Sequence, residues 1–389
     1  MAGSALVRVL KRMGRHAVRA PWPIPESVEA LLAVSDLAVY HLSGDLEDRE
    51  IYDMALERPG LVILHDLVLD RLVRGLMRSG EPMGIDSAQE ALAAFDRLQE
   101  AGLGEPLATP WCALAVRRAR GLVVHSAYAA RYVSAMGART PVFVAPHPAL
   151  ADRVPQRAAR RRGSRLRRSL PSGPVLGVVG DVGAEMGLEV AVEASRRLGE
   201  SASVVAIGSL AGEEASAFVG SFDAGPVTWA AHLPEDTMVA WLAACDVVLD
   251  LRNPPRTTTA TSVVRAMQLG VPVVASSPMS VPDGTREATA LLSSSPPDPS
   301  EVADAVRRVL AEHQSFGTAA SKAVERMSAG VVPAYAEAVD RTVALLRDPV
   351  RWSLGRWAAA LVDAGVPEGG VRSGYGTAYT DALEELRPG

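Results

Sequence analysis

Two strand-to-helix turns carry residue types that suit a phosphate group. In the first, Gly180 and Gly183 lie between an apolar run and the predicted helix Leu188–Leu198. Glycines at such a turn let backbone N–H groups approach a phosphate, and the helix N-terminus adds positive potential. Because a tight turn also requires glycine for steric reasons alone, the pattern equally fits a turn that binds nothing.

The second turn follows the apolar run 247–251 and contains three consecutive threonines. We expect a helix to begin near Thr258 or Thr259, where hydroxyl and N–H groups suit a phosphate. The same threonines could instead be ordinary helix N-caps. Arg252 and Arg256 lie in the loop before them and place positive charge at this turn.

A histidine ends each of three further apolar runs. His65 could polarise a hydroxyl group of a substrate, or it could be a hydrogen-bonded structural histidine at a strand end. Asp66, which follows it, suits a cap on the next helix. We interpret His125 and His147 as structural residues.

The elements that must position these residues are nine short apolar runs separated by helical patterns. The runs span residues 37–42, 61–64, 122–125, 142–145, 175–179, 203–207, 227–229, 247–251 and 271–275. Near-continuous apolarity favours parallel strands that are covered on both faces. The pattern predicts an α/β protein with two Rossmann-like doubly wound domains, the first of them abridged. Ligands of such sheets bind beyond the carboxyl ends of the strands, so the cleft between the domains is the expected site.

Composition changes along the chain predict four parts. Residues 1–150 form the abridged N-terminal domain, 151–172 an arginine-rich linker, and 173–345 the second domain. Residues 346–389 are expected to form a helical tail that packs back on the N-terminal domain. The eight arginines of 153–168 could meet phosphate, RNA or an anionic membrane, or they could cover a solvated helix face.

Charge and composition exclude several classes of protein. The 389 residues carry a net charge of −5, so no global charge favours nucleic acid. Cys112 and Cys245 lie among apolar residues without metal-ligand spacing, which indicates core positions in a reducing, cytoplasmic setting. The sequence contains no apolar run of about 18 residues, so no membrane-spanning helix is predicted. A basic N-terminal helix in residues 1–20 could touch an anionic membrane surface, or it could pack on its own domain.

The order of these motifs resembles family 4 glycosyltransferases of the GT-B fold, in a bacterial branch. The resemblance rests on the glycine turn, on the segment from Leu251 to Ser276 that ends RAMQLGVPVVAS, and on segments 51–73, 117–133 and 142–149. It implies a second domain that holds a nucleotide-diphosphate sugar as donor substrate. It also implies sugar transfer with retention of configuration, without a bound metal or another cofactor.

The resemblance places some residues in roles and shows departures at others. His65 matches a histidine that faces the cleft, and Trp229 and His232 lie in the segment expected to recognise the base. Asp181 stands where the family has a phosphate-binding arginine, and Met186 stands where it has a lysine. A carboxylate beside a diphosphate is repulsive.

Other positive charges would then have to stabilise the leaving diphosphate. The family has a segment with two acidic residues, of the type Glu-x7-Glu. Arg265 stands at the second acidic position, and the first falls on Thr257 or Thr258, neither of which is acidic. Arg256 could restore the lost charge from the neighbouring loop, with Arg265 and the threonine hydroxyls as further contacts. A plain solvated loop arginine is the alternative at position 256.

Three hypotheses follow from the sequence. The first is a retaining glycosyltransferase, of hexosyltransferase type, that moves a sugar from a nucleotide-diphosphate donor to an acceptor. The second is a catalytically degenerate partner or scaffold subunit, paired with a catalytic glycosyltransferase or with a second copy of itself. The third is an α/β enzyme whose cleft takes another phosphorylated ligand.

Overall fold

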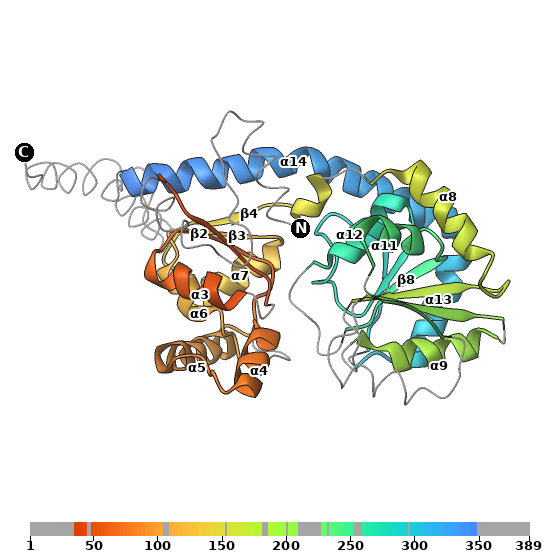
Figure 1. The fold of residues 1–389 in the computed structure, drawn as a ribbon, viewed down its shortest axis with the longest axis horizontal. Helices are drawn as coiled ribbons and strands as arrows, with labels where there is room; N and C mark the ends of the chain where they lie inside the picture. Colours follow the sequence, from red (N-terminus) through yellow and green to blue (C-terminus); the bar gives the residue numbers. More distant parts are fainter. Residues whose placement is uncertain are drawn as a thin grey trace, which may run out of the picture.

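The computed structural model describes residues 35–44, 48–103, 109–151, 154–180, 186–199, 201–208, 227–231, 233–252, 259–294 and 296–347. Within these ranges the chain forms two parallel β-sheets with helices on both faces, which confirms the predicted α/β class (Figure 1). The N-terminal basic helix and nearly all of the predicted tail lie outside the described residues.

The first sheet has four parallel strands in the order β1-β2-β3-β4. They are β1 (Val39–Leu42), β2 (Leu61–Leu64), β3 (Gly121–Val124) and β4 (Val142–Val144). All four were predicted from apolar runs to within two residues. Every residue of β2 and β3 is buried, as expected for parallel strands covered on both faces. In the described part of the chain this sheet has fewer strands than the second, and the abridgement of the first domain stays a prediction.

Alternate residues of the first sheet face two different layers. Val62 and Leu64 pack against helices on one face, and Leu61 and Ile63 pack against the long helix α14 (His313–Arg347) on the other. This alternation is the period of two that a strand imposes on its side chains. The helices of the first face are α3 (Asp48–Glu57), α4 (Asp70–Ser79), α5 (Ile85–Glu100), α6 (Ala113–Arg118) and α7 (Ala127–Ala135).

The second sheet has six parallel strands in the order β10-β9-β8-β5-β6-β7. They are β5 (Val175–Val179), β6 (Ser203–Gly208), β7 (Val227–Ala231), β8 (Val247–Asp250), β9 (Val273–Ala275) and β10 (Thr289–Leu291). The chain first builds outward from β5 and then returns to β8 on its other side. The strand order therefore reverses between β5 and β8, where ligands of such sheets bind.

Helices cover both faces of the second sheet as well. Helix α9 (Leu188–Leu198) and α13 (Pro299–Ala311) pack on one face with Leu176 and Val178 of β5. Helix α11 (Glu235–Leu242), α12 (Thr261–Leu269) and the first half of α14 belong to the core on the other face. Pro299 at the first turn of α13 and the Asp298 side chain, which accepts from two backbone N–H groups, fix the start of that helix.

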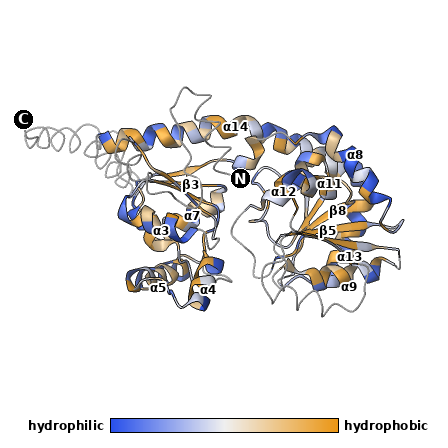
Figure 2. Cartoon of the chain, viewed as in Figure 1, coloured by the Kyte–Doolittle hydropathy of each residue, from blue (hydrophilic) through white to orange (hydrophobic). Residues whose placement is uncertain are grey.

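The arginine-rich stretch between the sheets forms helix α8 (Gln156–Arg167). Its buried Ala159 and Gly163 face helix α11, and a Cβ on Gly163 would lie 2.9 Å from the carbonyl oxygen of Ala240. Arg157, Arg161 and Arg165 are exposed on the outer side. Figure 2 shows α8 as largely hydrophilic and strands β5 and β8 as hydrophobic.

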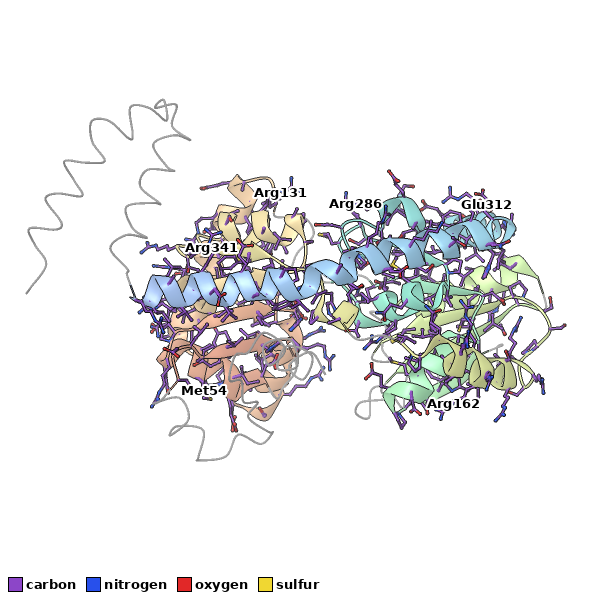
Figure 3. The ribbon with its side chains drawn as sticks, turned by 90° about the horizontal axis from the view of Figure 1, so that it is seen from above. Met54, Arg131, Arg162, Arg286, Glu312 and Arg341 are labelled. Carbon is purple, nitrogen blue, oxygen red and sulfur yellow. The ribbon has the colours of Figure 1, made fainter. Side chains whose placement is uncertain are left out.

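Helix α14 runs along both sheets and joins them (Figures 1 and 3). Its first half packs on α12, where Gly317 lies against Gly270. Its second half packs on the first sheet through buried Val331, Tyr335 and Ala338. This second half lies within the range 173–345 that the sequence assigns to the second domain. In the part of the chain that the structure describes, no helix has both the length and the apolarity to cross a bilayer.

Candidate functional site

Four histidines gather at the carboxyl edge of the first sheet. His41 lies in β1, His65 directly follows β2, His125 directly follows β3, and His147 lies three residues beyond β4. Because all four strands are parallel, these positions meet at one edge of the sheet. Neighbouring imidazole ring centroids are 4.9–5.8 Å apart.

Three of these histidines form a directional chain of hydrogen bonds. His125 Nδ1 lies 3.1 Å from the carbonyl oxygen of Ala145, which can only accept, so this nitrogen carries the proton. In neutral His125 the Nε2 atom is then an acceptor for His65 Nδ1, 3.0 Å away. By the same logic His65 Nε2 accepts from His41 Nδ1 at 2.9 Å. Both ring nitrogens of His65 are therefore engaged by other imidazoles.

Burial keeps three of these histidines, His65, His125 and His147, uncharged. Burial is the main cause that lowers the pKa of His65 well below its usual value, and the neighbouring imidazoles His125, His41 and His147 lower it further. Burial lowers the pKa of His125 to about 4, although its bond to Ala145 opposes the shift. Burial, His125 and Arg265 lower the pKa of His147 in the same direction. Three neutral imidazoles thus lie side by side near pH 7.

One nitrogen from each of His65, His125 and His147 can be chosen so that all three lie within 4.8 Å of one another. Neutral imidazole nitrogens at such spacing are potential metal ligands. The sequence analysis treated His125 and His147 as separate structural residues and missed the grouping. The available signal was a histidine in or just after each strand of one parallel sheet.

The glycine turn of the second sheet lies at the carboxyl end of β5. Gly180 has a φ of 146°, and its N–H donates to the carbonyl oxygen of Ile207 at 3.0 Å. A Cβ on Gly208, the last residue of β6, would overlap the Gly180 backbone, so the two strand ends are in close contact. Gly187, with a φ of 67°, then caps α9 against Leu251. Asp181 and Gly183 lie outside the described residues.

Met186 occupies the position where the resemblance expects a phosphate-binding lysine. Its side chain is buried in the core with Leu176 and Leu188, and only 5% of the residue is exposed. A thioether in a hydrophobic core provides neither charge nor a donor for a phosphate. At this position the chain therefore differs from the family both in residue type and in the packing of the side chain.

The carboxyl end of β8 carries a buried ion pair. Both carboxylate oxygens of Asp250 accept from the Arg252 guanidinium, at 2.6 and 2.7 Å. Burial alone would raise the pKa of Asp250, but the guanidinium outweighs it and holds this pKa below its usual value. Burial lowers the pKa of Arg252, but Asp250 above all, with Asp66, more than offsets this.

The helix after this loop starts later than predicted. Helix α12 begins at Thr261, and its N-cap is Ala260, which supplies no side-chain cap. The expectation of a helix start at Thr258 or Thr259 with a threonine N-cap was wrong for Thr259. That residue is buried, and the Ala260 N–H bonds the Ser280 carbonyl oxygen, so tertiary packing fixes the start. Thr258 and Arg256 lie outside the described residues.

Arg265 lies between the two sheets. Its guanidinium donates to the carbonyl oxygen of Ala149 and to Gln268 Oε1, both at 2.9 Å, and to Glu235 Oε1 at 2.7 Å. The side chain is only 6% exposed. Arg265 was predicted to bind a diphosphate, but its two terminal guanidinium nitrogens donate to protein acceptors at the domain junction.

The residues predicted to recognise a base are only partly described. Trp229 lies in β7, and its partly buried side chain packs against the core on the α9 face. His232 lies outside the described residues. The stacking role of Trp229 stays a prediction.

Comparisons with known proteins agree with this architecture. Residues 173–312 match the family model of glycosyl transferases group 1. No curated protein matches the sequence. Sucrose-phosphate synthase from Thermosynechococcus elongatus is a structural neighbour with 16% identity and a TM-score of 0.56, covering 82% of this chain and 77% of its own.

Two further solved structures are similar. HepE from Anabaena, in complex with UDP-glucose, has 16% identity and a TM-score of 0.54, with 89% of this chain and 95% of its own covered. A UDP-forming trehalose-phosphate synthase from Burkholderia xenovorans has 12% identity and a TM-score of 0.52, with 82% and 77% covered. At such identities the likeness establishes the fold, which is of the GT-B type with two Rossmann-like domains.

Proposed function

We propose that this chain is a retaining glycosyltransferase of family 4 that moves a sugar from a nucleotide-diphosphate donor to an acceptor. The match of residues 173–312 to glycosyl transferases group 1 carries the proposal. That range contains the Gly180 turn, the end of β8 and helix α12, which are the elements that surround the reversal of strand order. The UDP-glucose complex of HepE, a protein of similar fold, supports the same class of donor.

The donor diphosphate would bind at the carboxyl ends of β5 and β8. Gly183 would bring a backbone N–H group to it, whereas Gly180, whose own N–H bonds the Ile207 carbonyl oxygen, would only shape the turn. Arg256 with Thr258 and Thr259 would approach from the second turn. Arg252 and Arg265 donate hydrogen bonds to protein acceptors, so neither is proposed to bind a phosphate. Arg256 is then the cation that would stabilise the leaving diphosphate.

The acceptor would lie over the first sheet. His65 was predicted to polarise a hydroxyl group there. Because His41 and His125 engage both of its ring nitrogens, a sugar would have to displace one of these bonds to reach His65. The proposal therefore places the sugar beside this cluster and gives it no direct contact with His65 in the arrangement described.

A second candidate function is a non-catalytic partner of another glycosyltransferase. The buried Met186 favours it, because a core side chain stands where the resemblance expects a phosphate-binding lysine. The two candidates differ in one measurable property, which is binding of a donor.

Calorimetric titration of the full chain with UDP-, GDP- and TDP-sugars tests both candidates. Micromolar binding of one donor, weakened by Arg256→Ala, supports the transferase and contradicts the scaffold. No binding by any of the nucleotides contradicts the transferase. Full affinity in Arg256→Ala would remove the proposed phosphate contact. Co-purification with a second glycosyltransferase would test the partner function directly.

A further inference from the structure

We propose that His65, His125 and His147 bind one transition-metal ion, such as Zn²⁺, Co²⁺, Ni²⁺ or Cu²⁺, with His41 as the hydrogen-bond partner of His65. The inference is independent of the sugar-transfer proposal. Four of the seven histidines of the chain lie in this one cluster. They come from four segments that are far apart in the sequence.

The spacing of the nitrogens suits one ion. His65 Nδ1 and His125 Nε2 are 3.0 Å apart. Two imidazole nitrogens bound to one metal at about 2.1 Å, with an angle of roughly 90–110°, lie about 3.0–3.4 Å apart. The third nitrogen, from His147, completes a set that lies within 4.8 Å. Small side-chain rotations would therefore close the three ligands around an ion.

The outer hydrogen bond of His125 is the one that a metal-binding histidine requires, and His65 has a partner in place for it. A ligating imidazole usually donates its other N–H to an acceptor, which fixes the ring and its tautomer. His125 Nδ1 already faces the Ala145 carbonyl oxygen while Nε2 faces the cluster. His65 Nε2 faces His41 Nδ1, so an ion on His65 Nδ1 would leave the Nε2–H to donate to His41.

Metal binding would therefore reverse one hydrogen bond. Without an ion, His65 carries its proton on Nδ1 and donates to His125. With an ion on Nδ1, the His65 proton moves to Nε2, and His41 becomes the acceptor. His147 would also adjust, because its Nδ1 accepts from the Ala149 N–H at 3.2 Å and leaves Nε2 for the ion. Ligation through Nε2 puts the proton on Nδ1 and breaks that long bond.

The ligand set also defines the class of metal. Imidazole nitrogens suit Zn²⁺, Cu²⁺, Ni²⁺ and Co²⁺, whereas Mg²⁺ and Ca²⁺ require oxygen ligands. Within the part of the chain that the structure describes, the group that could hold an ion consists of imidazoles alone. Three neutral ligands leave the charge of the ion uncompensated, so water, hydroxide or another anion would take the open position. His65 is the least buried of the three proposed ligands.

Metal titration of the untagged full chain tests the inference. After dialysis against a chelator, we expect calorimetry to show one Zn²⁺ per chain, and Co²⁺ to give visible absorption bands of an imidazole-ligated ion. Zn²⁺ should also raise the melting temperature of the chain. In ¹⁵N spectra of the His65 ring, Zn²⁺ should move the proton from Nδ1 to Nε2. Nucleotides are absent from all four measurements.

Variants separate this site from adventitious binding. His125→Ala and His147→Ala should each weaken Zn²⁺ binding more than about 100-fold, and His41→Ala about 10- to 100-fold. His313→Ala is the matched control, because His313 bonds the Asp246 carbonyl oxygen outside the cluster and should leave affinity unchanged. If an alanine variant does not fold, His125→Gln and His147→Gln replace it.

Two results would overturn the inference. One is a chelator-treated chain that binds none of the four cations at ~10 μM. A stable protein site has a dissociation constant far below that concentration and would be filled. The other is a His147→Ala or His147→Gln chain that binds Zn²⁺ as tightly as His313→Ala. In either case the four histidines would be only a hydrogen-bonded cluster.

Discussion

The Arg265 guanidinium donates to the carbonyl oxygen of Ala149 across 116 residues of chain. Arg265 belongs to α12 of the second domain, whereas Ala149 lies in the 3₁₀ turn η1 (Pro148–Ala151), which follows the last strand of the first sheet. Gln268 and Glu235 accept further hydrogen bonds from the same guanidinium. One buried side chain therefore joins the end of the first domain to two helices of the second.

We expect Arg265→Ala to lower the free energy of unfolding by about 2–4 kcal/mol, because buried acceptors lose a charged donor. Urea denaturation measures the change. Arg161→Ala, an exposed arginine on α8, is the control and should change stability within error. A nucleotide-sugar donor that binds should raise the melting temperatures of Arg265→Ala and of the Arg161→Ala control equally. A smaller rise in Arg265→Ala would instead return Arg265 to the diphosphate site.

The strands show how far the sequence pattern reaches. Strand β5 has the bounds that its apolar run predicts, because β-branched residues buried on both faces leave a continuous signal. Strand β10 was missed, since its three residues contain one threonine and follow a 3₁₀ turn directly. The predicted strand 271–275 begins only at Val273, because Pro272 has no N–H for the ladder.

The candidate site was harder to predict because it depends on strand order. Each histidine by itself fits a structural residue at a strand end. Their proximity requires the order β1-β2-β3-β4 and a register that pairs His41 with Ile63, and a period-two pattern specifies neither. Arg265 shows the same limit, because its acceptor Ala149 is distant in sequence. Local patterns identified the candidate residues of the second sheet but not their partners.

The carboxylate of Glu301 provides a test of pH dependence. It accepts from the Ser293 N–H at 2.5 Å, from Ser293 Oγ at 2.7 Å and from the Ser294 N–H at 3.0 Å. Hydrogen bonds from Ser294 and Ser293 lower its pKa from 4.5 to about 2. Because the pKa is lower in the folded state, ionised Glu301 stabilises the fold at pH values above its pKa in the unfolded chain. This contribution is lost as the pH falls toward 2.

We therefore expect Glu301→Gln to be less stable than the parent chain at pH 7, with a difference that shrinks as pH falls below about 4.5. Urea denaturation at a series of pH values measures the difference. Glu325→Gln, at an exposed glutamate of α14, is the control. A difference between parent and Glu301→Gln that stays constant down to pH 3 would contradict the assigned hydrogen bonds.

The Asp250–Arg252 pair should be sensitive to the loss of either partner. Asp250→Asn leaves a largely buried guanidinium without its carboxylate, and we expect a loss of about 3–5 kcal/mol. The double variant Asp250→Asn with Arg252→Met should recover part of this loss, because it removes the uncompensated charge. Urea denaturation of the parent chain, both single variants and the double variant closes a double-mutant cycle. Equal losses in the single and double variants would mean that the pair contributes packing only.

The contact between Gly208 and Gly180 connects the second sheet to the proposed donor site. A Cβ at position 208 would overlap the Gly180 backbone, and backbone cannot move as the end of a flexible side chain does. Gly208→Ala should therefore displace the start of the glycine turn. If the N–H groups of this turn hold the donor diphosphate, their displacement weakens binding through lost hydrogen bonds.

We expect Gly208→Ala to raise the dissociation constant of the preferred nucleotide sugar by about 10-fold or more, which is roughly 1.4 kcal/mol or more. Calorimetry measures the affinity, and circular dichroism confirms that the chain is folded. Gly84→Ala is the matched control, because a Cβ there meets nothing within 4 Å and Gly84 has a negative φ. A folded Gly208→Ala chain with parental affinity would place the donor away from the Gly180 turn.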